Sequence, residues 1–213
     1  MSALPPDYDA DPERWSAWES PHDVHEVIAP ELRGPVLDIG CGEGRLASLL
    51  GDDVRWIGVD ASPAQVAANP HRPVVLADMC ALPFREGTVA EVTHLWCLYH
   101  VDDPLAAIGE AARVLRPGGH YYASTGARNN DPEIVFEGYP PSSFDAEDAP
   151  AIVEMVFEEI ASERWDRKFL PLKTRDEVRA YCRHHLIPPE RADEVEAPLW
   201  LTKRGVLIRA TKV

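Results

Sequence analysis

The sequence predicts an α/β fold in which a mainly parallel β-sheet is covered by helices on both faces. Short apolar runs alternate with helical segments as far as residue 125, and such alternation is typical of βαβ units. The apolar runs are nearly continuous, as expected of strands that are buried on both faces. The chain has 213 residues, of which 45% are hydrophobic, so one large core is expected. We therefore predict a single domain over residues 1–213.

Each element is predicted from a local pattern. Apolar residues recur at helical spacing in 21–32 and 104–115. Ser62, Pro63 and Gln65 predict a capped helix start, and Thr174 with Glu177 predicts another. The expected helices follow Gly44, begin at Pro63 and Thr174, and cover 21–32, 104–115 and 152–160, with a turn at "RPGG" (116–119). The expected strands are "PVLDI" (35–39), "VRWIGV" (54–59), "PVVLA" (73–77), "VTHLWCLY" (92–99), "HYYAST" (120–125), "ERWDRKFL" (163–170) and "RGVLIRATKV" (204–213).

The net charge of −15 disfavours a nucleic-acid partner, because binding to a phosphate backbone depends on Lys and Arg. A local basic patch remains compatible with this charge, although its simpler interpretation is a solvated strand and helix face. Its residues are Arg164, Arg167, Lys168, Lys173 and Arg175.

Two further absences limit the class of protein. No apolar run of about 18 residues occurs, so we expect no membrane span and a cytoplasmic location. The four cysteines share no C-x-x-C spacing, so we expect reduced thiols and no structural metal. Nothing in the sequence indicates an oligomeric state.

The segment "PVLDIGCGEGRLASLL" (35–50) places glycines at 40, 42 and 44, between a strand and a helix. Such a turn presents backbone N–H groups to a ligand. Arg45 stands where the dinucleotide fingerprint requires its third glycine, and no G-K-[ST] follows, so neither a nicotinamide site nor a P-loop is favoured. Asp38 at the mouth of the turn would repel a pyrophosphate and attract an ammonium group.

Two more acids follow the next two predicted strands. Asp60 lies 22 residues after Asp38, where a carboxylate accepts hydrogen bonds from both hydroxyls of a ribose. Asp78 follows the third strand and suits an exocyclic amine, with Met79 against a flat base. An ammonium, a ribose and an adenine together describe S-adenosylmethionine.

With these three acids and the glycine turn, the sequence resembles the class I S-adenosylmethionine-dependent methyltransferases, in particular the methyltransferase type 11 group. The matching motifs, in family order over residues 36–119, are "VLDIGCGEG", "GVDASPAQV", "ADMCALPF", "THLWCLYHVDDP" and "VLRPGG". The resemblance implies a Rossmann-like three-layer sandwich with a seven-stranded sheet of order 3-2-1-4-5-7-6, whose last strand is antiparallel. It also implies the cofactor S-adenosylmethionine and the product S-adenosylhomocysteine.

The resemblance also implies a set of cofactor-binding residues. Asp38 would lie near the methionine ammonium, the glycines would line the amino-acid part, Asp60 would bind the ribose, and Asp78 with Met79 would hold the adenine. The family's usual Phe-Asp before the fourth strand is replaced by Val89 and Ala90, a change that we expect to leave the cofactor site intact. The full predicted set is Asp38, Gly40, Cys41, Gly42, Asp60, Ala61, Asp78, Met79, His94 and Leu95.

The catalytic residues are harder to predict. Methyl transfer is a direct displacement, so the protein mainly aligns the reactants, and a base is needed only for a protonated acceptor. His100 and His94 are the candidate bases. His100 could instead cap the helix that starts near Asp103. His94 could instead line the cofactor site through its backbone. The helix over 15–33 and the proline-rich segment 126–150 are expected to cap the substrate side. Candidate substrate contacts are Trp15, Trp18, Trp96, Tyr99 and Tyr139.

We expect a small-molecule acceptor, because the chain is compact and acidic. An RNA or protein methyltransferase and a non-enzymatic module that binds S-adenosylmethionine remain alternatives, and fold resemblance does not exclude the latter. A nicotinamide-dependent oxidoreductase is disfavoured by Arg45. The sequence does not identify the acceptor, nor whether oxygen, nitrogen, carbon or sulfur receives the methyl group.

Overall fold

The computed structural model describes residues 23–134, 142–185, 187–188 and 190–213. These residues contain a seven-stranded sheet of order β3-β2-β1-β4-β5-β7-β6, which confirms the expected order. β7 pairs antiparallel with both β5 and β6, whereas the pairs among β1 to β5 are parallel. The strands are β1 (Val36–Ile39), β2 (Trp56–Asp60), β3 (Val74–Leu76), β4 (Val89–Leu95), β5 (Leu115–Gly126), β6 (Glu159–Leu172) and β7 (Leu199–Thr211).

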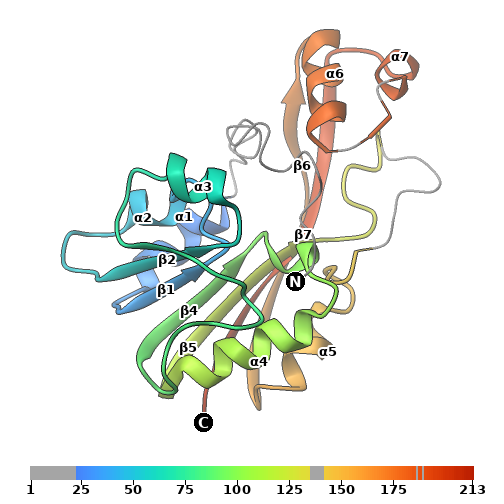
Figure 1. The fold of residues 1–213 in the computed structure, drawn as a ribbon. Coiled ribbons are helices and arrows are strands. Elements are labelled where there is room, and N and C mark those ends of the chain that lie inside the picture. Colours follow the sequence, from blue (N-terminus) through green and yellow to red (C-terminus); the bar gives the residue numbers. More distant parts are fainter. Residues whose placement is uncertain (1–22, 135–141, 186, 189) are drawn as a thin grey trace.

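Helices cover both faces of the sheet, as predicted. Figure 1 shows α1, α2 and α3 on one side of the strands and α4 and α5 on the other. The described helices are α1 (Val24–Ile28), the 3-10 turn η2 (Ala29–Glu31), α2 (Arg45–Leu49), α3 (Pro63–Ala68), η3 (Leu98–His100), α4 (Pro104–Val114), α5 (Ala149–Glu154), α6 (Arg175–His184) and α7 (Arg191–Glu194). None of them is long and apolar enough to cross a membrane.

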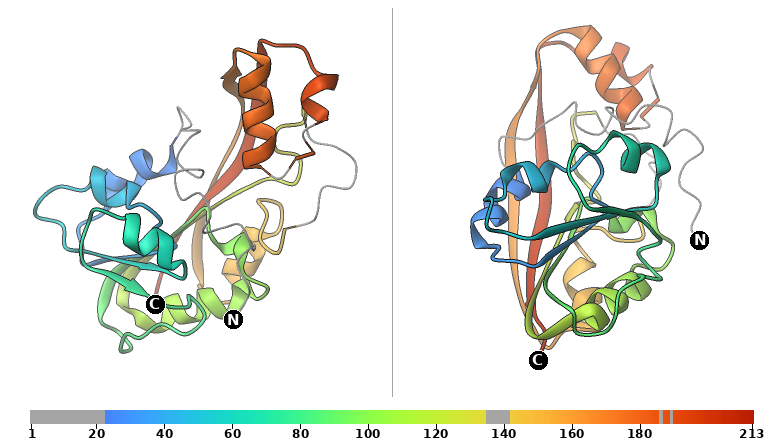
Figure 2. Two further views of the ribbon diagram at one scale, coloured as in Figure 1. Left: turned by 45° about the horizontal axis from the view of Figure 1, so that its top comes forward. Right: turned by 60° about the vertical axis from the view of Figure 1, so that its left-hand side comes forward.

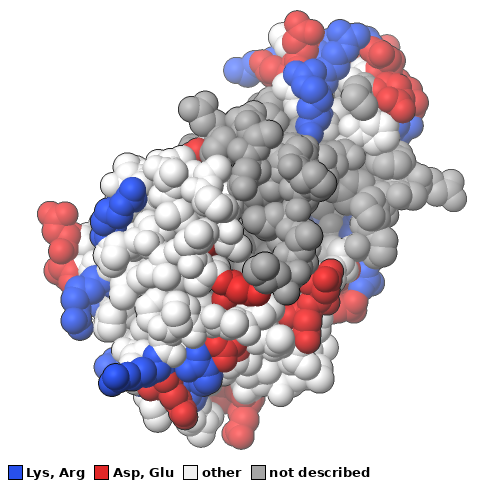
Figure 3. Space-filling view, in the orientation of Figure 1, with Lys and Arg blue, Asp and Glu red and all other residues white. Residues whose placement is uncertain are grey.

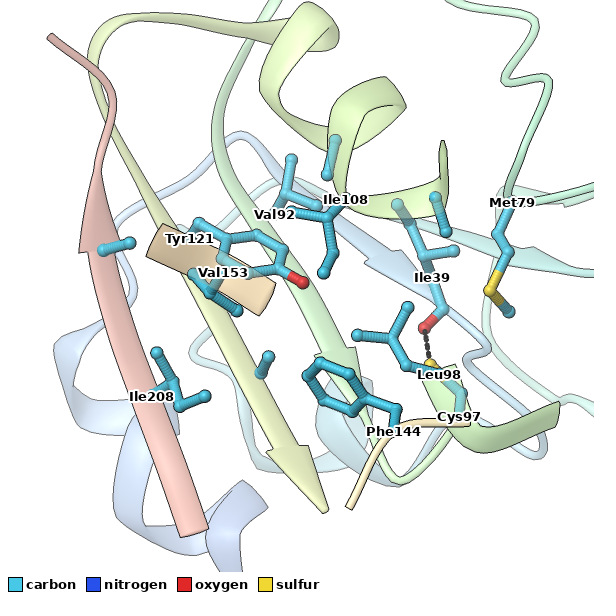
Figure 4. Packing of buried hydrophobic residues seen from close by; sticks show 14 of the residues in the cluster. Ile39, Met79, Val92, Cys97, Leu98, Ile108, Tyr121, Phe144, Val153 and Ile208 are labelled. Atoms are coloured by element: carbon cyan, nitrogen blue, oxygen red, sulfur yellow. Dashed lines mark hydrogen bonds between the residues drawn. The ribbon is translucent and has the colours of Figure 1, made fainter. Parts of the chain in front are cut away.

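The larger core lies between the sheet and the helices α4 and α5. Figure 4 shows Val92 of β4, Tyr121 of β5 and Ile208 of β7 turned toward Ile108 of α4 and Val153 of α5. A second cluster fills the opposite face of the sheet, where Ile28 of α1 and Leu46 of α2 pack with Trp56 of β2 and other buried residues. The continuous apolar strands predicted from the sequence therefore belong to a sheet that is buried on both faces.

Several elements differ from the prediction. The strand expected over 92–99 is β4, which ends at Leu95, and Leu98–His100 form the 3-10 turn η3 instead. Residues 116–119 lie within β5 and bulge from it, because Val89 pairs with Leu115 while Glu91 already pairs with His120. The helix expected over 152–160 is α5, which ends at Glu154. Ile160 instead pairs with Ala210 of β7, because the antiparallel ladder of β6 begins at Glu159.

The described part of the expected N-terminal helix is short. The side chain of Asp23 caps α1 by accepting from the His25 amide, so this helix begins at Val24, and Pro30 then interrupts the regular pattern. Arg45 of α2 forms an ion pair with Asp23 and so joins the first two helices. Residues 15–22 lie outside the described residues.

A projecting unit, formed by α6 and α7, was not anticipated as a separate feature. It lies between β6 and β7 in the chain and stands at the end of these two long strands in Figures 1 and 2. Its own apolar cluster contains Val178, Tyr181 and Cys182 of α6. Figure 3 shows charged residues of both signs gathered on its surface. We call it the α6–α7 unit.

This unit lies on the side of the sheet where the parallel strands end. Gly126 at the end of β5 pairs with Gly205, so the residues of β7 before Gly205 extend beyond the carboxyl end of β5. Ligands of open α/β sheets bind at that edge. The α6–α7 unit is therefore placed on the ligand side of the fold.

Candidate active site

The glycine turn after β1 contains two glycines with different surroundings. Gly40 has a φ of +70°, and a Cβ added there would lie 2.5 Å from the Cβ of Cys97. Gly40 thus allows close packing against the segment after β4. Gly42 has a φ of +49°, but its added Cβ would meet only Gln65 Oε1, at 3.6 Å. The turn consequently leaves space beside Gly42, where a ligand can approach the backbone.

Asp38 lies beneath this turn and is only 3% exposed. Its carboxylate accepts hydrogen bonds from Thr93 Oγ1 at 2.7 Å and from Trp56 Nε1 at 3.2 Å. Burial raises the pKa of Asp38, and these hydrogen bonds oppose the shift. A cationic group bound nearby would also favour the ionised carboxylate. The environment of Asp38 therefore fits the predicted ammonium partner.

Asp60 at the end of β2 is joined directly to the glycine turn. Its Oδ2 accepts from the Gly42 amide at 2.8 Å, and its Oδ1 accepts from the Ser62 amide at 2.9 Å. Ser62 caps α3 by accepting from the Gln65 amide, so the carboxylate is fixed between a turn and a helix start. Each carboxylate oxygen has the capacity for two hydrogen bonds, which makes this arrangement compatible with ribose hydroxyls as further donors.

Asp78 and Met79 follow β3 at the same edge of the sheet. The amide of Ala77 donates to the Asp60 carbonyl at 3.0 Å, which places the end of β3 beside the end of β2. Asp78 Oδ1 accepts from the Cys80 amide at 2.9 Å and is half-buried, whereas Met79 is 9% exposed. The three predicted acids therefore belong to three adjacent strands: Asp38 lies within β1, Asp60 ends β2 and Asp78 follows β3. Ala61, also in the predicted set, is exposed between Asp60 and the start of α3.

His94 and Leu95 end β4, and both side chains are buried. The His94 ring is 0% exposed and lies 3.0 Å, through Nδ1, from the hydroxyl of Tyr121. Burial lowers the pKa of His94 to about 3. Its Nε2 is buried with no hydrogen-bond partner among the described residues. This geometry favours the backbone of His94, rather than its imidazole, as the part that faces a ligand.

The segment after β4 carries the remaining described candidates. Trp96 has a φ of +57° and packs edge-on against Trp165 of β6, with ring centroids 5.8 Å apart. Tyr99 and His100 are half-buried, and their rings lie 4.5 Å apart. Burial lowers the pKa of His100 to about 4. Its imidazole is therefore neutral at pH 7, and the lowered pKa makes it a weaker base than an exposed histidine.

The cap of α4 is Asp103, not His100. The Asp103 carboxylate accepts from the Ala106 amide at 3.0 Å, so the alternative role considered for His100 is wrong. Cys41 is buried, and burial together with the nearby carboxylates of Asp38 and Asp60 raises the pKa of its thiol. Cys41 is thus a neutral thiol that packs behind the turn.

The predicted capping segment 126–150 is partly a core element. Phe144 is fully buried, and its carbonyl accepts from Thr125 Oγ1 at 2.7 Å. Ser143 Oγ donates to the Val101 carbonyl at 2.6 Å, which joins this segment to the loop after β4. Trp15, Trp18 and Tyr139 lie outside the described residues.

Sequence reasoning missed Trp165 and, among the polar residues around it, Glu147, Asp166 and Arg204. A cavity of about 260 Å³ lies beside Trp165 and is also lined by Ala127, Ala146, Glu147, Arg164, Asp166, Arg204 and Gly205. Trp165 is buried while the residues from 161 to 168 around it are exposed, and this single aromatic within a charged run of the sequence was the available signal. Of the expected basic patch, Arg164, Arg167 and Lys168 are exposed on β6, the edge strand of the sheet, where charges discourage pairing with other chains.

Residues 37–123 match a family described as "Methyltransferase domain". Over 115 residues the chain is 34% identical to a probable S-adenosylmethionine-dependent methyltransferase of Mycolicibacterium smegmatis, covering 51% of this chain and 45% of the relative. It is 34% identical to a ubiquinone biosynthesis O-methyltransferase of Marinobacter nauticus, covering 44% of each. It is 33% identical to a demethylmenaquinone methyltransferase of Symbiobacterium thermophilum, covering 54% of this chain and 52% of the relative. The chain thus spans about half the length of these curated relatives.

Solved structures share the fold at lower identity. A putative methyltransferase from Bacillus halodurans superposes with a TM-score of 0.63 at 20% identity, covering 89% of this chain and 97% of the other. The complex of a Haloferax volcanii putative methyltransferase with the Trm112 methyltransferase activator gives a TM-score of 0.65 at 19% identity, covering 99% and 98%. At such identities the likeness establishes the fold alone.

Proposed function

We propose that this protein, whose residues 37–123 match a methyltransferase domain family, transfers a methyl group from S-adenosylmethionine to a small-molecule acceptor. The observation that carries the proposal is the hydrogen bond between the Gly42 amide and Asp60. It joins the end of β2 to the glycine turn. Asp60, which we expect to bind the ribose of the cofactor, therefore lies against the backbone of Gly42, which we expect to contact its amino-acid part.

The chain's own residues divide the work of binding. Asp38 offers a negative charge beneath the turn, Asp60 offers acceptors to a ribose, and Asp78 offers an acceptor to an exocyclic amine. The open side of Gly42 lets the ligand approach the backbone closely. When bound, S-adenosylmethionine supplies an electrophilic methyl group on a sulfonium.

The protein's part in the transfer is alignment of the acceptor, which in favourable cases supplies about 7–11 kcal/mol of the barrier. Trp96, Tyr99 and His100 follow β4 and would form the acceptor side of the site. The rings provide apolar walls that exclude water and suit the cationic methyl donor. The imidazole of His100 would accept the proton of an acceptor that must lose one; its lowered pKa makes it a weak base, which suits an acceptor whose proton is readily lost.

A small-molecule acceptor is supported by composition and by the relatives. The net charge of −15 disfavours a phosphate backbone as a partner. Two of the curated relatives are named a ubiquinone biosynthesis O-methyltransferase and a demethylmenaquinone methyltransferase, names that refer to small molecules.

A labelled-methyl screen tests this proposal. The purified protein is incubated with S-adenosylmethionine that carries a deuterated methyl group and with three separate pools: a metabolite extract, total RNA and denatured cell protein. We expect the mass label in a compound of the metabolite pool, and the Asp60→Ala variant should lose it. Label only in RNA or protein would overturn the small-molecule acceptor. Binding of the cofactor without label in any pool would favour a non-enzymatic module.

A further inference from the structure

A largely buried polar cluster joins three separate parts of the chain at the base of the α6–α7 unit. Asp131 follows β5, Tyr181 belongs to α6 and Lys203 belongs to β7. The Tyr181 hydroxyl donates to Asp131 Oδ2, and Lys203 Nζ lies 2.7 Å from both that oxygen and the Tyr181 hydroxyl. Lys203 Nζ also lies 5.3 Å from the centroid of the Tyr181 ring. The cluster therefore connects the α6–α7 unit with the end of the sheet.

Asp131 adopts a costly conformation in this cluster. Its φ is +54° and its side chain is 3% exposed. Left-handed backbone is unfavourable for most residues, although Asp and Asn tolerate it better than others. Asp131 Oδ1 is buried with no hydrogen-bond partner among the described residues. Such strain persists only where the surrounding structure fixes it, and it concentrates at functional sites.

Apolar contacts reinforce the same connection. Ile134, three residues after Asp131, is fully buried in the cluster formed by Val178 and Tyr181 of α6 and Leu201 of β7. The amide of Asp131 donates to the Thr202 carbonyl at 3.0 Å, so this segment follows β7 beyond the end of β5. The segment that leaves the acceptor side of the sheet is thus attached to the α6–α7 unit.

We propose that Asp131, Tyr181 and Lys203 are positioning residues that hold the α6–α7 unit at a fixed orientation over the carboxyl end of the sheet. The unit then forms one wall of the acceptor site, and its orientation determines which acceptors fit. The catalytic consequence rests on the proposed methyltransferase function, but the orientation itself does not. None of the three residues needs to contact the cofactor.

Distances between spin labels test the orientation directly. In a Cys80→Ser background, labels are attached through Asp52→Cys, on the exposed turn before β2, and Asp176→Cys, at the exposed start of α6. The distance distribution is compared among the otherwise unaltered protein, Tyr181→Phe, Asp131→Asn and Lys203→Met. Asn keeps the tolerance for positive φ, so Asp131→Asn removes the charge without adding backbone strain.

A stability-matched control separates orientation from folding. Val178→Ala leaves a cavity in the same apolar cluster but keeps all three polar residues. Temperatures are chosen so that each variant is equally far below its thermal midpoint. Affinity for S-adenosylhomocysteine, measured by calorimetry, reports the cofactor site independently.

We expect the distance distribution to broaden about twofold in the three cluster variants and to stay narrow in Val178→Ala. Lys203→Arg, which keeps the charge, should largely restore the narrow distribution. An unchanged width in Tyr181→Phe and Asp131→Asn, or equal broadening in Val178→Ala, would overturn the proposal. Failure of the unaltered protein to bind S-adenosylhomocysteine would instead count against the proposed function and leave the distance result standing.

Discussion

The backbone amide of Gly42 donates a hydrogen bond of 2.8 Å to Asp60 Oδ2. Two motifs that lie eighteen residues apart in the chain thereby form one surface at the carboxyl ends of β1 and β2. The contact has consequences for cofactor affinity and for the roles of the two glycines in the turn.

Replacement of Asp60 by alanine should weaken the binding of S-adenosylmethionine and of S-adenosylhomocysteine by about tenfold or more. A tenfold loss of affinity corresponds to roughly 1.4 kcal/mol. The variant removes the expected ribose acceptor and the partner of the Gly42 amide together. Asp60→Asn keeps one carbonyl oxygen and should lose less. The exposed Asp53→Ala is the matched control in isothermal titration. Unchanged affinity in Asp60→Ala would remove Asp60 from the cofactor site.

Gly40→Ala and Gly42→Ala should fail in different ways. Both positions have positive φ, so each alanine costs about 1–2 kcal/mol of backbone strain. The new methyl group at position 40 also collides with Cys97, which overpacks the core and adds about 1–3 kcal/mol. Gly42→Ala should retain more stability in urea denaturation but lose affinity for S-adenosylhomocysteine. Equal losses of stability would contradict this division of roles.

His100→Ala should reduce turnover of a protonated acceptor while cofactor affinity is retained, because the imidazole is the expected base. Asp103→Ala is the contrasting variant: it removes the cap of α4 and should cost about 1 kcal/mol of stability with normal turnover per folded molecule. Stability, titration and labelled-methyl transfer are measured for both. Full turnover in His100→Ala would show that the reaction needs no base at this position.

The buried His94 should make the protein less stable in mild acid. Its pKa falls from 6.5 to about 3 on folding because of burial, so between these values the unfolded chain binds a proton that the folded chain does not. Stability should therefore fall as pH drops below 6.5, by up to about 1.4 kcal/mol per pH unit for this group. The free energy of unfolding, measured by urea denaturation at several pH values between 7 and 5, should depend less steeply on pH in His94→Asn. Identical slopes would contradict the buried neutral state.

The strand order was predicted from the family resemblance that short local motifs carry, and the structure confirms it. The cofactor-binding roles of the three acids stay predictions, although the sequence indicated that these acids lie at one edge of the sheet. Asp38, Asp60 and Asp78 each follow an apolar run, and parallel strands bring their carboxyl ends to one edge. The capping roles of Ser62 and Thr174 were also predicted correctly, since a cap depends on residues three positions apart.

Other features depend on contacts between distant residues. The cluster of Asp131, Tyr181 and Lys203 joins residues 22 to 72 positions apart, and no local pattern marks them. Ile160 was expected in a helix but lies in β6, because the β6–β7 ladder extends farther than the apolar pattern suggests. The burial of His94 likewise depends on Tyr121 from the neighbouring strand.

The central claim is that the carboxyl ends of β1, β2 and β3 together bind one cationic nucleoside. The most direct measurement is a crystal structure of the protein with S-adenosylmethionine, followed by a competition soak with NADH. We expect the ribose at Asp60, the adenine near Asp78 and Met79, and the amino-acid part over Gly42, with no displacement of the ligand by NADH. A turn left empty by S-adenosylmethionine, or filled by NADH in its place, would contradict the central claim.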